Sequence, residues 1–284
     1  MKKIAVVGAG TMGTGIAQVI AASGFSTVVK DVEPAVLERS HQAMEGSLKK
    51  ILFKQQGTEA GASVQEILAR ISFSTTWESM ADADFAIEAI NENLDLKLQV
   101  IEKLDGILPQ HSVIASNTSS ISITRLAAAT RSPDRVIGMH FMNPVPLMKL
   151  VEIIRGLQTS DRTYEITREL AEALGKTAVA VNDSPGFVSN RVLMPMLNEA
   201  MFALQEGVST AESIDTVMKI GMNHPMGPLQ LADFIGLDVC LDILNVLYEN
   251  FRDPKYRACP LLVKMVAAGF LGKKSGRGFY LYEK

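Results

Sequence analysis

Short apolar runs alternate with longer helical stretches over roughly the first two thirds of the chain. The β-branched runs predicted as strands are Ile4–Val7, Thr27–Val29, Arg70–Phe73, Phe85–Ile87, Ser112–Ala115, Val136–His140 and Val179–Val181. Such alternation is typical of a mostly parallel sheet covered by helices. It predicts an α/β domain over residues 1–184.

The pattern changes near Pro185-Gly186. The segments 187–206, 210–220, 229–250 and 261–268 carry apolar stripes of helical period, with no convincing strand between them. We therefore predict that residues 185–284 form an all-α C-terminal domain.

A long helical region, Pro34 to Arg70, separates the second and third predicted strands and is broken around Gly57 to Gly61. It exceeds a simple crossover and predicts a helical-hairpin insertion that projects from the sheet. Ser47 and Lys54 share one face of its first arm, where Lys49 and Lys50 add charge. This basic face could bind phosphates, although an ordinary solvated helix surface explains the same spacing.

The first predicted strand runs directly into Gly8-x-Gly10-x-x-Gly13, and a helix follows. In such a motif the first glycine permits a tight turn, the second lets a pyrophosphate approach the backbone, and the third lets the helix pack closely on the sheet. Asp31 ends the second predicted strand at the distance expected of the acid that binds ribose hydroxyls. The sequence therefore predicts a Rossmann-type dinucleotide site.

The cofactor preference depends on Asp31 and its neighbour Lys30. A carboxylate at this place binds the ribose hydroxyls of NAD and repels the extra phosphate of NADP. A nearby cation would weaken that repulsion, but side chains alternate along a strand, so we expect Lys30 to point away. NAD is favoured, and NADP stays open.

Composition sets modest bounds, because 284 residues with 47% hydrophobic and 21% charged positions are ordinary for a globular protein. The net charge of −3 argues against general attraction to nucleic acids or membrane surfaces. Lys2-Lys3 resembles the start of a secretory signal, but Gln18, glycines and threonines interrupt the apolar stretch that follows. Cys240 and Cys259 lack C-x-x-C spacing, so we expect buried thiols in a reducing cytoplasm. Metal-binding spacing such as H-E-x-x-H is absent, which argues against a metal hydrolase.

Two further stretches carry candidate chemistry. The strand ending at Ala115 empties into a polar turn, which places Asn117 and Ser119 at the carboxyl edge of the sheet, where open α/β folds bind ligands. Later, two apolar runs flank a turn, and antiparallel pairing about Pro146 would bring His140 opposite Glu152. A histidine oriented by a carboxylate can take the proton that an alcohol loses during hydride transfer. A solvated turn, a structural histidine and a solvent-facing acid are the alternatives.

The chain closely resembles the L-3-hydroxyacyl-CoA dehydrogenases, and among them the short bacterial 3-hydroxybutyryl-CoA dehydrogenases, along essentially its full length. The segments that carry the resemblance are Gly8-Ala-Gly-Thr-Met-Gly13, Ala115-Ser-Asn-Thr-Ser-Ser120, Gly138-Met-His-Phe-Met-Asn-Pro-Val-Pro146, Met148-Lys-Leu-Val-Glu152, Pro185-Gly-Phe-Val-Ser-Asn-Arg191, His224-Pro-Met-Gly-Pro-Leu229 and Gly272-Lys-Lys-Ser-Gly-Arg-Gly-Phe-Tyr280. Met142 and Ser189 depart from residues common in that family and fall where they could reshape the acyl pocket.

The resemblance implies reversible hydride transfer between NAD and an acyl-CoA thioester in fatty acid or butanoate metabolism, by a homodimer. It makes His140 the acid/base, Glu152 its partner, Ser119 the residue that binds the substrate 3-oxygen, and Asn190 a helper in the site. The cofactor contacts that it implies are Gly8, Gly10, Thr11, Met12, Gly13, Asp31, Glu92, Lys97, Asn117, Ser119, Asn143 and Lys274. The CoA contacts are Ser47, Lys54 and Ser119.

Two other classes of protein are compatible with parts of this pattern. Dehydrogenases of the 6-phosphogluconate type share a two-domain plan, but they call for a lysine where this chain has Asn190-Arg191. Lens crystallins related to the resembled family bind dinucleotide without catalysis. The joint presence of Ser119, His140, Glu152 and Asn190 argues for an enzyme.

Overall fold

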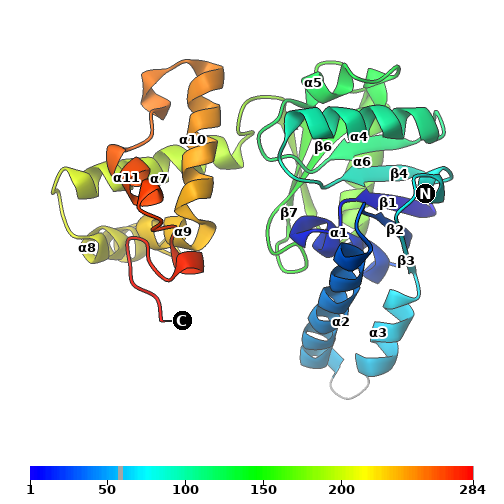
Figure 1. Ribbon diagram of the computed structural model, residues 1–284, viewed down its shortest axis with the longest axis horizontal. Coiled ribbons are helices and arrows are strands. Elements are labelled where there is room, and N and C mark those ends of the chain that lie inside the picture. The colour runs from blue at the N-terminus through cyan, green and yellow to red at the C-terminus, as the bar shows by residue number, and fades with distance from the viewer. Residues whose placement is uncertain (57–59, 284) are drawn as a thin grey trace. The chain divides into compact units, whose positions relative to one another are not determined.

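The computed structural model describes residues 1–56 and 60–283, and for residues 54–56 and 60–62 it describes the backbone alone. The chain divides into two compact units, Met1–Asp183 and Ser184–Lys284 (Figure 1). The first unit is built on a sheet, and the second consists mainly of helices.

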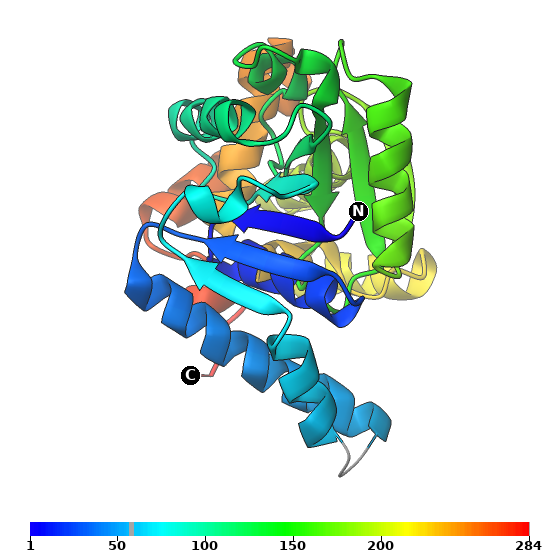
Figure 2. The ribbon, with the colours of Figure 1, turned by 90° about the vertical axis from the view of Figure 1, so that its right-hand side faces the viewer.

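An eight-stranded sheet with the order β3-β2-β1-β4-β5-β6-β7-β8 forms the centre of the first unit in the described residues; Figure 2 shows β1, β2 and β3 side by side. The strands are β1 (Lys3–Val7), β2 (Ser26–Lys30), β3 (Ile71–Ser74), β4 (Phe85–Glu88), β5 (Val113–Ser116), β6 (Val136–Phe141), β7 (Leu150–Arg155) and β8 (Thr177–Asn182). Neighbouring strands pair in parallel except for β6 and β7, which pair antiparallel. The order from β3 to β6 is that of dinucleotide-binding sheets. The predicted Rossmann-type sheet is confirmed.

Helices cover both faces of this sheet. One buried apolar cluster includes Ile4 and Val6 of β1 and joins their face to α1 (Thr11–Ala22), α2 (Pro34–Gln56), α3 (Ala60–Leu68) and α6 (Asp161–Ala173). The helices α4 (Leu94–Ile107) and α5 (Ile123–Ala127) contact strands β4 to β7. Short 3-10 turns lie at Glu78–Met80 (η2) and Pro133–Arg135 (η3).

The hairpin insertion is confirmed, since α2 and α3 lie between β2 and β3 in the chain, contact each other and extend away from the sheet (Figure 1). Its first arm begins at Pro34, a residue suited to the first turn of a helix. The residues near its tip, including the side chain of Lys54, lie outside the described residues.

The second unit contains α7 (Ser189–Gln205), α8 (Ala211–Thr216) with its π-helical continuation η4 (Val217–Gly221), α9 (Pro228–Ile235), α10 (Leu237–Phe251), η5 (Pro254–Tyr256), α11 (Pro260–Ala267) and η6 (Lys273–Ser275). The prediction of one helix over residues 229–250 is wrong. Gly236 has φ +109°, outside the helical region, so the segment divides into α9 and α10. Cys240 and Cys259 are buried, as expected.

Candidate cofactor and catalytic site

The glycine-rich segment links β1 to α1 at the carboxyl edge of the sheet. Gly8 has φ +102°, and a Cβ there would lie 2.6 Å from a carbonyl oxygen of the loop after β4. A Cβ at Gly13 would lie 1.8 Å from the Gly8 carbonyl oxygen, whereas a Cβ at Gly10 would meet no described atom within 4 Å. Gly8 and Gly13 therefore permit close packing, and Gly10 leaves the backbone open. The loop fits a pyrophosphate at the N-terminus of α1, where Thr11 and Met12 begin the helix.

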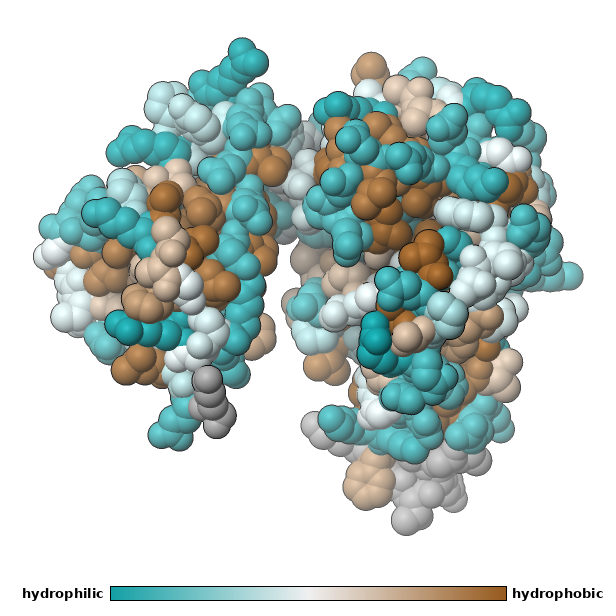
Figure 3. All heavy atoms as spheres, viewed as in Figure 1, coloured by the Kyte–Doolittle hydropathy of each residue, from teal (hydrophilic) through white to brown (hydrophobic). Residues whose placement is uncertain are grey.

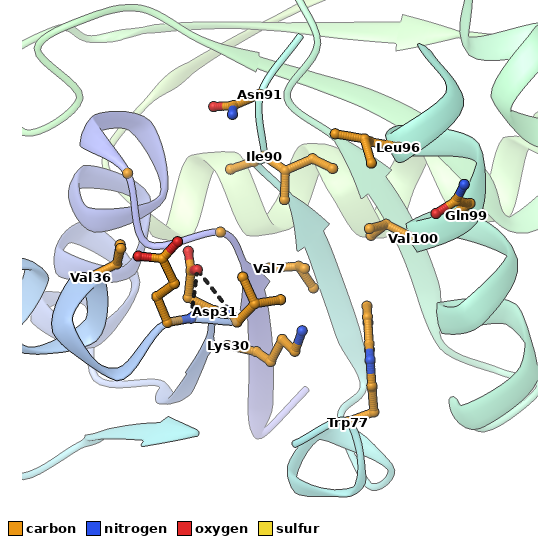
Figure 4. Close-up of a pocket in the computed structure, with 15 residues that line it drawn as sticks. Val7, Lys30, Asp31, Val36, Trp77, Ile90, Asn91, Leu96, Gln99 and Val100 are labelled. Atoms are coloured by element: carbon orange, nitrogen blue, oxygen red, sulfur yellow. Dashed lines mark hydrogen bonds between the residues drawn. The ribbon is translucent and has the colours of Figure 1, made fainter. Parts of the chain in front are cut away.

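A cavity of about 540 Å³ lies beside this loop and is bordered by Asp31 (Figure 4). The Asp31 carboxylate is fixed by backbone, because its Oδ2 accepts from the Ala9 N–H at 2.8 Å and its Oδ1 from the Val32 N–H at 2.7 Å. Apolar residues on the other sides include Val7, Val36, Trp77, Ile90, Leu96 and Val100. An apolar slot with one fixed carboxylate fits the adenosine half of a dinucleotide.

Lys30 lines the same cavity, so the expectation that it points away from the site is wrong. The cavity lies beyond the end of β2 and is therefore bordered by residues that leave both faces of the strand. The Lys30 side chain is 4% exposed, and its ammonium lies 4.2 Å from the centre of the Trp77 ring. Burial lowers the pKa of Lys30, and Asp31 partly opposes that effect. Trp77, which the sequence did not single out, thus holds a cation beside the acid (Figure 4).

Substituting Asp31→Asn should raise the NADPH-to-NADH ratio of kcat/KM about tenfold, or 1.4 kcal/mol, because the repulsive charge disappears while a hydrogen-bond acceptor stays. Initial rates with each cofactor measure this ratio. Glu33→Gln is the matched control, since Glu33 lines the same cavity and its substitution removes the same charge. An unchanged ratio in Asp31→Asn, or an equal change in Glu33→Gln, would contradict the assignment.

The predicted register of the antiparallel pair is confirmed, with His140 of β6 directly opposite Glu152 of β7. Opposite residues share one face of a sheet, and the two side chains meet: the His140 Nδ1–H donates to Glu152 Oε2 at 2.9 Å. His140 is 8% exposed and Glu152 is 2% exposed. Glu152 is therefore not the solvent-facing acid of the alternative interpretation.

Glu92, in the loop between β4 and α4, holds the polar turn after β5. Its Oε1 accepts from the Ser119 N–H at 2.9 Å and from the Ser120 N–H at 3.1 Å, and also from the Thr118 hydroxyl. Burial opposes ionisation of Glu92, but Lys97 and these hydrogen bonds outweigh it and lower its pKa. Glu92 is thus a carboxylate at neutral pH.

The Lys97 side chain is 1% exposed, and its ammonium binds oxygens of its own chain. It donates to Glu88 Oε1 at 2.6 Å and to the Ile90 carbonyl oxygen at 3.2 Å, and lies 3.4 Å from Glu92 Oε2. A direct contact between Lys97 and a cofactor would require this arrangement to open. Glu88, which binds Lys97, was not predicted as a site residue, because in the sequence it is only the polar residue that ends an apolar run.

Asn117, directly after β5, bonds to β4 and β6, the strands on either side of β5. Its N–H donates to the Glu88 carbonyl oxygen at 2.8 Å, and its Oδ1 accepts from the Phe141 N–H at 2.9 Å. The residue that Asn117 binds therefore directly follows His140. The turn with Ser119 and the strand with His140 are fixed relative to each other.

A second cavity of about 460 Å³ joins the glycine loop, α2 and the turn after β6. Asn143 borders it from the turn, and Ser47 borders it from α2. Arg39 also lines it, a cation that the sequence analysis missed. Arg39 lies eight residues before Ser47, so both are on one helix face. This spacing could have indicated Arg39 as a further cation of the site.

The remaining candidates belong to the second unit. Asn190 lies in the first turn of α7 and is 9% exposed. The Lys274 ammonium donates to Asp238 Oδ2 at 2.6 Å. In the part of the chain that the structure describes, no group of three or more His, Cys, Asp or Glu side chains could hold a metal ion. No described helix is long and apolar enough to cross a membrane.

The strand order, the glycine loop and Asp31 make the first unit a dinucleotide-binding domain of the dehydrogenase class. Residues 3–184 match the family model for the 3-hydroxyacyl-CoA dehydrogenase NAD binding domain, and residues 186–282 match that for the C-terminal domain. The chain belongs to the 3-hydroxyacyl-CoA dehydrogenase family and is an NAD-dependent oxidoreductase.

Similar proteins match along nearly their whole length. A probable 3-hydroxybutyryl-CoA dehydrogenase of Bacillus subtilis is 56% identical over 100% of this chain and 98% of its own. A 3-hydroxybutyryl-CoA dehydrogenase of Bradyrhizobium diazoefficiens is 50% identical over 99% of this chain and 96% of its own. The crystal structure of (S)-3-hydroxybutyryl-CoA dehydrogenase from Ralstonia eutropha is 51% identical, with a TM-score of 0.96 over 100% of both chains.

Proposed function

We propose that the protein interconverts (S)-3-hydroxybutyryl-CoA and acetoacetyl-CoA with NAD(H). The observation that carries this proposal is the buried pair in which His140 Nδ1 lies 2.9 Å from Glu152 Oε2, beside a strand edge suited to a dinucleotide. The names of the B. subtilis, B. diazoefficiens and R. eutropha relatives support the four-carbon substrate.

His140 and Glu152 supply the proton chemistry in this proposal. With the Nδ1 proton directed at Glu152, the neutral ring carries its lone pair on Nε2, which takes the hydroxyl proton during oxidation. Glu152 then stabilises the imidazolium by its negative charge and fixes the ring orientation. In reduction, His140 returns the proton to the 3-oxygen. A bound NAD would supply the hydride acceptor for the carbon that bears this oxygen.

Ser119 and Asn190 orient the substrate in this scheme, with Ser119 donating to the 3-oxygen. The cofactor is held by the glycine loop and Asp31, together with Asn117, Asn143 and Lys274, and with Glu92 and Lys97 through the turn that they support. The supporting observation is that Asn117, Glu92 and the Ser119 turn form one hydrogen-bonded group at the carboxyl edge of the sheet.

We assign CoA to the cavity between α2 and the turn after β6. Ser47 and Arg39 line it, and Lys54 follows on the same helix, outside the described side chains. CoA carries several phosphate charges, and cations on one helix face attract them locally although the chain is acidic overall. In this assignment the basic face of α2 binds phosphates and is not an ordinary solvated helix surface.

The functional unit in this proposal is a cytoplasmic homodimer acting in fatty acid or butanoate metabolism. Large apolar side chains of the second unit are exposed, among them Ile220 (81%), Val192 (66%) and Phe234 (58%). Apolar and polar residues are interspersed on the face of this unit seen in Figure 3. Self-association through the helical unit would cover such side chains.

The direct test follows absorbance of reduced nicotinamide while the purified protein meets acetoacetyl-CoA, with NADH and NADPH in parallel and a longer 3-oxoacyl-CoA as second substrate. We expect rapid NADH oxidation with the four-carbon thioester. Faster oxidation with the longer thioester would overturn the proposed chain length. Dinucleotide binding without oxidation of any substrate would overturn the proposed reaction.

A further inference from the structure

At the carboxyl end of β4, one buried ammonium lies between a fully buried carboxylate and a partly exposed one. Glu88 is fully buried and Lys97 is 1% exposed. Lys97 lies 2.6 Å from Glu88 Oε1 and 3.4 Å from Glu92 Oε2. One cation thus faces two acids, Glu88 in the interior and Glu92 at the surface of the turn.

Such a group is a poor source of stability. Desolvation of buried charges offsets much of their attraction, and well-packed apolar residues at the same place are often as stable or more so. Both oxygens of the Glu88 carboxylate instead accept hydrogen bonds that fix neighbouring segments. Oε1 accepts from Lys97 and from the Ile90 N–H at 2.7 Å, and Oε2 accepts from the Ser116 hydroxyl at 2.5 Å. Glu88 therefore ties the loop after β4 to the end of β5.

The two acids hold the turn after β5 at both of its ends. The Ser116 hydroxyl that donates to Glu88 also accepts from the Thr118 N–H at 3.2 Å. Glu92 accepts from the backbone N–H groups of Ser119 and Ser120. Lys97 joins the two acids, so a shift of one carboxylate is passed to the other end of the turn.

We propose that Glu88 and Lys97 are positioning residues that act through Ser116 and Glu92 to place Ser119 relative to His140. The link to the catalytic strand is Asn117, which sits inside the same turn and accepts from Phe141 next to His140. The assignment rests on the role of Ser119 in the proposed function. It also gives Lys97 a task that its buried ammonium can perform without touching the cofactor.

A double-mutant cycle of Glu88→Gln and Ser119→Ala tests this assignment, with kcat for acetoacetyl-CoA reduction at saturating NADH as the readout. If Glu88 acts through Ser119, Glu88→Gln lowers kcat about tenfold in the parent protein and less than about twofold in the Ser119→Ala background. A purely structural role would instead lower kcat by the same factor in both. Ser116→Ala cuts the link from Glu88 to the turn without changing the charged group, and should give the same non-additive loss.

Asp105→Asn is the matched control, because Asp105 is a buried acid at the other end of α4, where Arg135 donates to its Oδ1 at 2.7 Å. We expect it to lower the melting temperature and leave kcat unchanged in both backgrounds. Equal losses from Glu88→Gln with and without Ser119, or the same non-additivity in Asp105→Asn, would overturn the positioning role alone. Full turnover in Ser119→Ala would overturn the role of Ser119 in the proposed function as well.

Discussion

Replacing His140 with alanine should lower kcat for acetoacetyl-CoA reduction by about 10³-fold, within the range expected for loss of general acid–base catalysis. The residual activity would come from positioning of the reactants, which the substitution leaves in place. NADH affinity should change little, because His140 is not among the residues that line the adenosine cavity. Initial rates give kcat, and the fluorescence of bound NADH gives its dissociation constant.

His111→Ala serves as the control for this experiment. The His111 side chain is 61% exposed and lies near Asp84, which precedes β4 at the opposite edge of the sheet from His140. Its replacement should leave turnover unchanged. Equal losses of turnover and of NADH affinity in His140→Ala would contradict the acid–base role and point to general damage to the site.

Glu152→Gln should lower kcat by about 10²-fold, because it keeps the size of the side chain and removes the charge that stabilises the imidazolium. An amide can also present either oxygen or nitrogen to His140 Nδ1, so the ring orientation is less well fixed. The double variant with His140→Ala should be no slower than His140→Ala itself, since both residues act as one unit. Initial rates of the four proteins close this cycle.

Glu165→Gln is the corresponding control, because Glu165 lies on α6 with its side chain 53% exposed and pairs with Arg168. Exposed pairs of this kind contribute little, so neither turnover nor stability should change noticeably. Wild-type kcat in Glu152→Gln would show that the buried pair of β6 and β7 serves structure and not proton transfer.

Local sequence patterns were sufficient to predict most of the helices and strands and one long-range contact. The glycine spacing predicted the loop after β1, and antiparallel pairing of two apolar runs about Pro146 predicted the register that sets His140 opposite Glu152. The glycine spacing and the apolar runs can both be identified in the sequence without knowledge of tertiary contacts. The family resemblance added expected roles for residues such as Asn190, which spacing alone could not supply.

Other features depend on side chains that meet only after folding. Lys30 was expected to point away, but the cavity lies past the end of its strand and Trp77 holds its ammonium. Glu88 appeared as the polar end of an apolar run, and its partner Lys97 lies on a helix. The break at Gly236 was hidden because the apolar period continues across it. Tertiary packing decided each of these cases.

The segment 142–149 between β6 and β7 has a further consequence for how this family can vary. Successive residues of a strand face opposite sides of the sheet, so sliding β7 by one residue would turn Glu152 away from His140. A single inserted or deleted residue in this connection, absorbed as such a slide, would abolish the pair without changing either amino acid. A slide of two residues would keep Glu152 on the same face but carry it about 7 Å along the strand, away from His140. The length of this connection is therefore as much a determinant of proton transfer as the histidine itself.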